Sequence, residues 1–149
     1  MSTEDARDIG LGKYAAFYAA LDPGKLAELR RLCTPDVHFR DPFNEVRGVE
    51  AMIRIFEKMY QDADQIAFEV VDAMRNGDRA MLLWVFYCRP KSLRLKDAWR
   101  IEGASEIHLT ADGRIKAHLD HWDSGAQFYA RLPLIGPVIR YLRRRLHVA

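Results

Sequence analysis

Cysteine is scarce in this chain, and long apolar runs are absent. Only two cysteines, Cys33 and Cys88, occur among 149 residues, which excludes a disulfide scaffold and a zinc ribbon built from CxxC pairs. The longest purely apolar run, residues 80–88, has nine residues, whereas a helix needs about 20 to cross a bilayer. The first twelve residues contain acids and no apolar centre, unlike a secretory signal. We therefore expect a soluble, cytoplasmic protein in which both cysteines are buried and inert.

Motifs for metals and for nucleotide cofactors are also missing. The five histidines show no HExxH spacing, the helical pattern of many catalytic zinc sites, and strand alternation would separate His118 from His121. A facial site made of Asp41, His118 and Asp120 is the one metal alternative that the sequence leaves open. No glycine-rich phosphate loop is present. The sequence therefore predicts no metal and no cofactor.

Charge is distributed unevenly along the chain. Hydrophobic residues make up 49% and charged residues 30% of the sequence, as in a single folded domain of ordinary composition, which we assign to residues 1–149. Five arginines and no acidic residue follow Ser124, so a basic tail is attached to a mildly acidic body. Because the positive charge is confined to one end, we expect no general binding to nucleic acid.

Helical spacing dominates the first part of the sequence. Apolar residues recur at helical intervals over about residues 12–21 and 25–32, with a break at a proline and a glycine between them. A short extended segment, 37–40, ends close to another proline. Residues 49–61 then carry the clearest amphipathic helix pattern of the chain. We therefore expect two short helices, a strand and a longer helix.

From residue 66 onward, apolar residues alternate with polar ones over several segments, which is the period of β-strands. We expect strands over residues 66–70, 79–89, 98–109 and 114–122, with tight turns rich in asparagine, aspartate and glycine. A helical tail follows them. Helices, one short strand, a helix and four long antiparallel strands predict an α+β fold, in which the helices pack on one side of a curved sheet.

Two segments of the sequence resemble the nuclear-transport-factor-2-like superfamily. The segment 39–48, FRDPFNEVRG, is similar to the stretch that precedes the long helix of ketosteroid isomerases, and residues 99–122 resemble the final hairpin of that family. The resemblance covers about residues 12–122 and implies a cone-shaped, curved, mostly antiparallel sheet wrapped on N-terminal helices, as in ketosteroid isomerases and SnoaL-like polyketide cyclases. It divides a single SnoaL-like domain into a core of about residues 12–123 and an extra C-terminal amphipathic extension of about residues 124–147.

The resemblance assigns functional positions one by one. Asp41 matches the aspartate that carries the proton in ketosteroid isomerases. The oxyanion tyrosine of those enzymes falls on Phe17, with Tyr14 and Tyr18 nearby on the same helix, and their second oxyanion donor falls on Ser105. An isomerase with neither donor in place would lack most of its enolate stabilisation. We therefore reject ketosteroid isomerisation as the specific activity.

The last strand supplies the candidate catalytic pair. Strand alternation puts His118, Asp120 and Trp122 on one face, and the resemblance implies that this face lines an apolar cavity with Asp41 near its mouth. Carboxylates and an imidazole in a dry pocket suit general acid/base chemistry, and SnoaL-like cyclases are similar in using an acid on a late strand. We therefore predict that Asp41, His118 and Asp120 are catalytic, with either aspartate as the base and the histidine as its acid partner or orienter. The predicted substrate-binding residues are Tyr14, Tyr18, Arg40, Trp99, Ser105 and Trp122.

These assignments have structural alternatives. His118 and Asp120 would also suit a solvated face or an ion network with Arg40 or Arg114, and an aspartate before a proline, such as Asp41, would suit a turn. The pattern favours a cofactor-free isomerase, cyclase, dehydratase or epoxide hydrolase that acts on a hydrophobic small molecule in an apolar pocket. The alternatives are a non-catalytic binding protein for a lipid-like or polyketide-like ligand, or a dimeric scaffold, and the resemblance implies a homodimer.

The tail has a pattern of its own. Residues 138–146 place apolar side chains on one helical stripe and arginines away from it. We expect this basic helix to pack across the mouth of the cone or against a second subunit. A helix that lies on a membrane surface is the alternative.

Overall fold

The computed structural model describes residues 1–148 and has an α+β fold. Its elements, in chain order, are α1 (Thr3–Ala19), η1 (Pro23–Glu28), α2 (Leu29–Leu32), β1 (Cys33–Arg40), β2 (Glu45–Arg47), α3 (Val49–Asp62), β3 (Ala63–Asn76), β4 (Arg79–Pro90), η2 (Lys91–Leu93), β5 (Trp99–Leu109), β6 (Ile115–His121), α4 (Ser124–Gln127), η3 (Tyr129–Arg131) and α5 (Ile135–Leu146).

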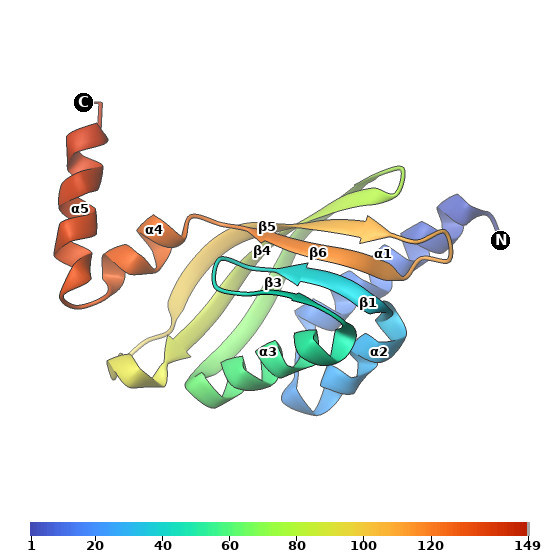
Figure 1. Cartoon of the computed structure of the whole chain (residues 1–149), viewed down its shortest axis with the longest axis horizontal. Helices are drawn as coiled ribbons and strands as arrows, with labels where there is room; N and C mark the ends of the chain where they lie inside the picture. Colours follow the sequence, from blue (N-terminus) through green and yellow to red (C-terminus); the bar gives the residue numbers. More distant parts are fainter. Residues whose placement is uncertain (149) are drawn as a thin grey trace.

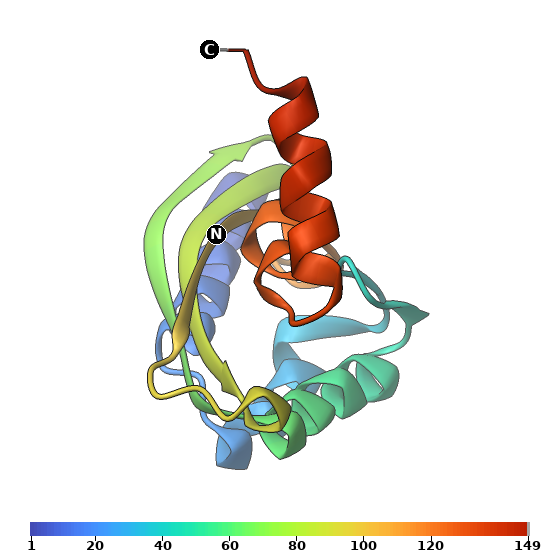
Figure 2. The same cartoon turned by 90° about the vertical axis from the view of Figure 1, so that its left-hand side faces the viewer.

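One sheet organises the molecule. Its strand order is β2-β1-β6-β5-β4-β3, and every neighbouring pair is antiparallel except β1 and β6, which are parallel. The sheet curves, with α1 and α3 on its concave side (Figures 1 and 2). The predicted fold class is therefore confirmed. The parallel pairing of β1 and the short strand β2 were not predicted.

Helix α1 begins earlier than its apolar pattern indicates. We expected it from about residue 12, but it starts at Thr3. A capping box fixes this start: the Ser2 hydroxyl accepts a hydrogen bond from the Asp5 amide at 3.1 Å, and the Asp5 carboxylate accepts one from the Ser2 amide at 3.2 Å. The second predicted helix, residues 25–32, is divided into the 3-10 turn η1 and the single turn α2.

The core lies between the two long helices and the concave face of the sheet. Helix α1 buries Leu11, Tyr14, Phe17 and Tyr18, and α3 buries an apolar stripe of its own. Residues three and four apart share a face of a helix, so each helix presents one continuous apolar surface to the strands. The buried residues of α3 are Val49, Met52, Ile53 and Phe56.

Two glycines let α1 lie directly against the turn between β5 and β6. A Cβ atom at Gly10 would lie 1.9 Å from the carbonyl oxygen of Gly113, and one at Gly113 would lie 2.2 Å from the carbonyl oxygen of Ala6. Gly113 also has a φ of +83°, a conformation that favours glycine. Only residues without side chains permit this approach of the two backbones.

The C-terminal segment extends the sheet edge and then leaves the body. Strand β6 ends at His121, and the side-chain amide of Gln127 then pairs with the backbone of Glu102 on β5. It accepts from the Glu102 amide at 2.7 Å and donates to the Glu102 carbonyl at 2.9 Å. Helix α5 packs against α4 and η3 and projects away from the sheet (Figure 1). The expected packing across the mouth of the cone is therefore not formed, and the expected contact with a second subunit stays a prediction. Within residues 1–148, no helix combines the length and the apolar character needed to cross a bilayer.

Candidate functional site

A cavity of about 290 Å³ lies between the concave face of the sheet and α3. Its walls are predominantly apolar and include several aromatic rings. A few polar side chains interrupt them, and three of these come from neighbouring positions of β5 and β6, namely Ser105, His118 and Asp120. The aromatic residues of the lining are Tyr18, Phe39, Phe43, Phe56, Phe68, Trp84, Phe86 and Trp122.

Asp120 is the carboxylate in the interior of this cavity. Its side chain is 17% exposed, and Asp120 lies directly opposite Ser105 in the antiparallel register of β5 and β6. Oδ1 of Asp120 accepts hydrogen bonds from the Ser105 hydroxyl at 2.5 Å and from Nε2 of His118 at 2.7 Å. Within residues 1–148, no side chain or backbone group hydrogen-bonds to Oδ2 of Asp120. One oxygen of the carboxylate is thus fixed, and the other has no protein donor.

His118 is held from both sides of its ring. It is 2% exposed, and its Nδ1 lies 2.7 Å from the Tyr14 hydroxyl and 3.4 Å from the Tyr18 hydroxyl. Burial raises the pKa of both tyrosines well above their ordinary value of 10, so both keep their protons. A donor hydroxyl at Nδ1 and an acceptor carboxylate at Nε2 place the imidazole proton on Nε2. His118 therefore donates to Asp120.

Trp84 fixes the direction of the serine hydroxyl. Its indole Nε1–H donates to Oγ of Ser105 at 2.8 Å. Since an indole nitrogen can only donate, the Ser105 proton is left to point at Asp120. Gly103 leaves room for this indole, because a Cβ there would lie 2.4 Å from a ring carbon of Trp84. Trp84 was not among the predicted site residues, and its role as a donor was missed.

Asp41 lines the mouth of the cavity but is engaged in the turn between β1 and β2. Its Oδ1 accepts from the backbone amides of Phe43 and Asn44, both at 2.7 Å. The side-chain amide of Asn44 lies 3.2 Å from Oδ1 and 3.1 Å from Oδ2 of Asp41. The alternative that we gave for Asp41, a turn residue before a proline, is therefore present in the structure.

The predicted substrate-binding residues divide into two groups. Tyr18, Ser105 and Trp122 line the cavity, whereas Tyr14 is fully buried and reaches the site through His118. Arg40 and Trp99 are not among the lining residues. Trp99 lies outside the lining because β5 extends beyond the end of β6 there and the tail covers it, and its role in substrate binding stays a prediction. Its ring packs against Phe128 at 5.9 Å and beneath the Arg131 guanidinium at 5.5 Å.

Two alternative arrangements of the polar cluster, an ion network and a metal site, are not formed in the structure. Arg114 pairs with Asp112 at 3.0 Å, and His118 and Asp120 pair with each other, so the alternative ion network with Arg40 or Arg114 is not formed. Within residues 1–148, no three histidine, cysteine or acidic side chains lie together as metal ligands. The facial site with Asp41 is therefore not assembled.

Lys58 and Asp62 also line the mouth and pair at 2.6 Å. We did not single them out, although their i,i+4 spacing was a visible signal.

Comparisons with known proteins agree with this architecture. The family model of the SnoaL-like domain matches residues 14–118, whereas no curated protein matches the sequence. A SnoaL-like polyketide cyclase from Jannaschia sp. CCS1, so named with reservation in its own description, is similar in structure with a TM-score of 0.67 and 14% identity, over 82% of this chain and 88% of that chain. An LEH-like epoxide hydrolase from M. tuberculosis gives a TM-score of 0.62 and 16% identity, over 92% and 94%.

A third structure, an NTF2-like protein of unknown function from Exiguobacterium sp. 255-15, gives a TM-score of 0.64 and 18% identity, over 76% of this chain and 98% of that chain. At these identities, the structural similarity shows the fold alone. The family match is of a different kind, because it rests on the sequence and spans most of the chain. The protein belongs to the SnoaL-like family, and its fold is that of NTF2-like proteins of known structure.

Proposed function

We propose that the protein is a cofactor-free enzyme that transfers a proton on a hydrophobic small molecule, with Asp120 as the acid/base. The observation that carries the proposal is the asymmetric environment of the Asp120 carboxylate. Ser105 and His118 hold Oδ1, while Oδ2 has no donor among residues 1–148 and the side chain lines an apolar cavity. A base must reach the proton that it removes, and Oδ2 is the oxygen free to do so.

His118 orients Asp120 in this proposal and is not the base itself. Both ring nitrogens are already engaged, one by Tyr14 and the other by Asp120. The Nε2–H and the Ser105 hydroxyl point at Oδ1, so a proton taken up by the carboxylate is placed on Oδ2. Asp41 is the weaker candidate for the base, because its carboxylate already accepts hydrogen bonds from Phe43 and Asn44.

The walls of the cavity define the class of substrate. Apolar and aromatic side chains dominate the lining, which favours a neutral, apolar molecule and excludes bulk water from the reacting groups. Isomerisation, aldol-type cyclisation and dehydration all begin with removal of a proton from carbon, whereas epoxide hydrolysis begins with activation of water. The names of the polyketide cyclase and the epoxide hydrolase that share the fold lend support to both kinds of reaction.

Two probe reactions test the proposal. The first follows exchange of the α-hydrogens of 2-tetralone in D₂O by ¹H NMR, and the second follows hydrolysis of styrene oxide. The wild-type protein should accelerate at least one of them. Asp120→Asn should lower that rate by about 10²–10⁴-fold, the usual contribution of a general base. Asp36→Asn is the matched control, because Asp36 is exposed on β1, and it should leave the rate unchanged.

The alternative is a binding protein without catalysis, which the same apolar cavity would also suit. It predicts that 2-tetralone shifts the NMR signal of the Trp122 indole, since Trp122 lines the cavity, while neither probe reacts faster than in buffer. Equal rates for wild type and Asp120→Asn would remove the catalytic assignment of Asp120.

A further inference from the structure

Helix α5 presents an apolar stripe to solvent. Residues three or four positions apart share one face of a helix, and five apolar side chains do so over the length of α5. Among them, Val138 is 56%, Leu142 is 52% and Leu146 is 84% exposed. Soluble proteins rarely leave a continuous apolar surface uncovered without a partner. The five residues of this stripe, which we call the α5 stripe, are Ile135, Val138, Ile139, Leu142 and Leu146.

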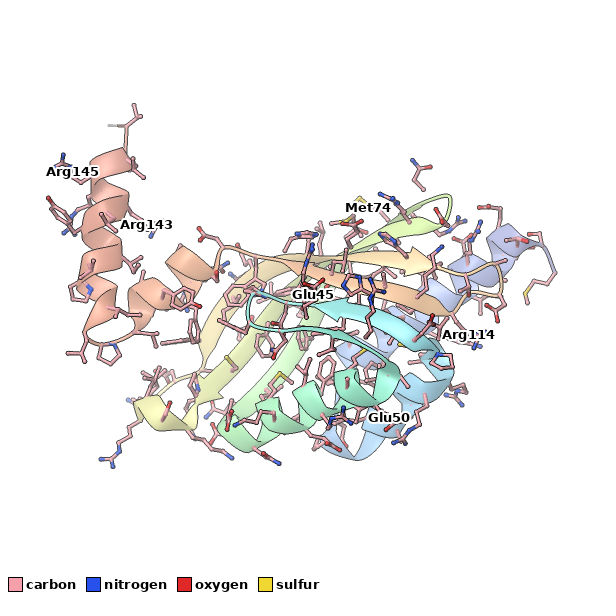
Figure 3. The ribbon with its side chains drawn as sticks, in the orientation of Figure 1. Glu45, Glu50, Met74, Arg114, Arg143 and Arg145 are labelled. Carbon is pink, nitrogen blue, oxygen red and sulfur yellow. The ribbon has the colours of Figure 1, made fainter. Side chains whose placement is uncertain are left out.

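Arginines border the stripe. Helical spacing places Arg143 at one edge of it and Arg145 at the other, and the two side chains project to different sides of α5 (Figure 3). Arg144 lies on the opposite face, and Arg140 turns back to donate to the carbonyl of Ala130 at 2.5 Å. Long arginine side chains at the border of an apolar face can extend their charges toward a polar boundary.

The tail and the body have charges of opposite sign. The tail carries five arginines and no acid after Ser124. The rest of the chain has 18 of the 23 lysines and arginines against all 21 acidic residues. The substantial contacts of α5 are with α4 and η3. Within residues 1–148, the body therefore neither covers the α5 stripe nor pairs an acidic side chain with Arg143, Arg144 or Arg145.

From this arrangement, we propose that α5 binds the surface of an anionic lipid bilayer, with its stripe in the acyl boundary and the bordering Arg143 and Arg145 on the lipid phosphates. An anionic bilayer offers an apolar boundary for the stripe and negative charge for the arginines. A second copy of α5 would cover the stripe but would bring no acidic side chain to the arginines, because the tail has no acid after Ser124. Nucleic acid would neutralise the arginines but would leave the stripe in water.

The bilayer would also lie close to the mouth of the cavity. Phe128, in the segment that carries α5, packs against Phe43 with ring centroids 5.0 Å apart, and Phe43 lines the cavity. Figure 2 views the molecule from the end that carries α4 and α5. Binding through α5 would therefore bring this end of the cone to the lipid surface, where apolar molecules concentrate.

Sedimentation of the full chain with vesicles tests the proposal. We expect the wild type to sediment with vesicles that contain phosphatidylglycerol in phosphatidylcholine, more weakly at high salt, and not with phosphatidylcholine alone. Arg143→Gln/Arg144→Gln/Arg145→Gln should lower the partition coefficient by about a hundredfold, and Leu142→Gln/Leu146→Gln by at least about tenfold. The control Arg31→Gln/Arg54→Gln/Arg79→Gln removes the same charge from exposed positions of the body and should change it by less than about threefold.

Several outcomes would overturn the proposal. Absence of sedimentation with phosphatidylglycerol vesicles at low salt is one, and equal sedimentation of wild type and both tail variants is another. A dimer in light scattering that Leu142→Gln/Leu146→Gln dissociates would identify the stripe as a contact between copies. Tighter binding to a labelled DNA duplex than to the vesicles would assign the arginines to nucleic acid. Near-ultraviolet circular dichroism should be unchanged in the two tail variants, because α5 projects from the body, and in the control variant, because its three positions are exposed.

Discussion

The hydroxyl of Tyr14 lies 2.7 Å from Nδ1 of His118, although 104 residues separate them in the chain. This hydrogen bond joins the first helix to the last strand. It also determines which imidazole nitrogen carries the proton, and thereby which atom faces Asp120. The position of α1 is therefore part of the geometry of the candidate site.

Replacing Tyr14 should destabilise the fold and release the histidine. In Tyr14→Phe, Nδ1 of the buried His118 loses its closer donor and retains only the Tyr18 hydroxyl at 3.4 Å, which should lower the free energy of unfolding by about 1–3 kcal/mol. Tyr141→Phe is the control, because Tyr141 is 52% exposed on α5 and should change stability by less than about 0.5 kcal/mol. Urea denaturation measures both values. Equal stability of the two variants would show that the buried hydrogen bond contributes nothing net.

Two glycines of α1 should respond to the same substitution with opposite sign. Gly10→Ala would drive a methyl group into the backbone of Gly113 and should cost about 2–4 kcal/mol through displacement of α1. A Cβ at Gly12 meets nothing within 4 Å, so Gly12→Ala should stabilise the helix by up to about 1 kcal/mol. Thermal unfolding of both variants checks this difference. If Gly10→Ala is as stable as wild type, α1 does not lie against the β5–β6 turn.

Alkaline pH should destabilise the protein through its two cysteines. Burial raises the pKa of Cys33 to about 12 and that of Cys88 to about 11, from an ordinary 9.0. Below pH 9, both thiols are protonated in the folded and the unfolded chain. As pH rises further, the unfolded chain releases protons that the folded chain retains, so the free energy of unfolding falls.

Urea denaturation between about pH 8 and 10 should show this fall in the wild type and a smaller one in Cys33→Ala/Cys88→Ala. The two profiles are compared by slope, because the alanines also remove buried volume. Above about pH 10, the raised pKa of Tyr14 and Tyr18 acts in the same direction in both proteins. Parallel profiles below that pH would contradict the assignment to the cysteines.

Asp41 should matter for stability through the turn that it organises. Asp41→Ala removes the acceptor of the Phe43 and Asn44 amides and should cost about 1–2 kcal/mol. Asp41→Asn retains a side-chain oxygen and should cost less. Denaturation of the two variants separates the cases. Equal losses in the two variants would show that the charge, and not the acceptor, holds the turn.

Regions whose structure depends on neighbours in the sequence could be predicted. The apolar stripe after Gly48 predicted a helix over residues 49–61, and α3 runs from Val49 to Asp62. Alternation predicted that His118 and Asp120 share a face, and both line the cavity. Gly48 has a φ of +103°, which explains why glycine stands at the start of this helix.

Features that depend on contacts between distant segments could not be predicted. The first turns of α1 carry few apolar residues, and their acids Glu4 and Asp8 pair with Arg75 on β3, both at 2.7 Å. Strand β2 has three residues, too few to show a period. For Trp99, alternation correctly placed the side chain on the same face of β5 as Ser105. It carries no information on where the neighbouring strand, β6, ends.

The parallel pairing of β1 with β6 has a consequence for the order of folding. Until Ile115–His121 has been synthesised, no strand joins the β1–β2 hairpin to the β3–β4–β5 meander within the sheet. Such distant pairings slow folding, because the loop must close before the contact is gained. A nascent chain that ends before Ile115 would therefore hold two separate pieces of sheet, and ribosome-bound intermediates of that length should expose the apolar faces that the finished protein conceals.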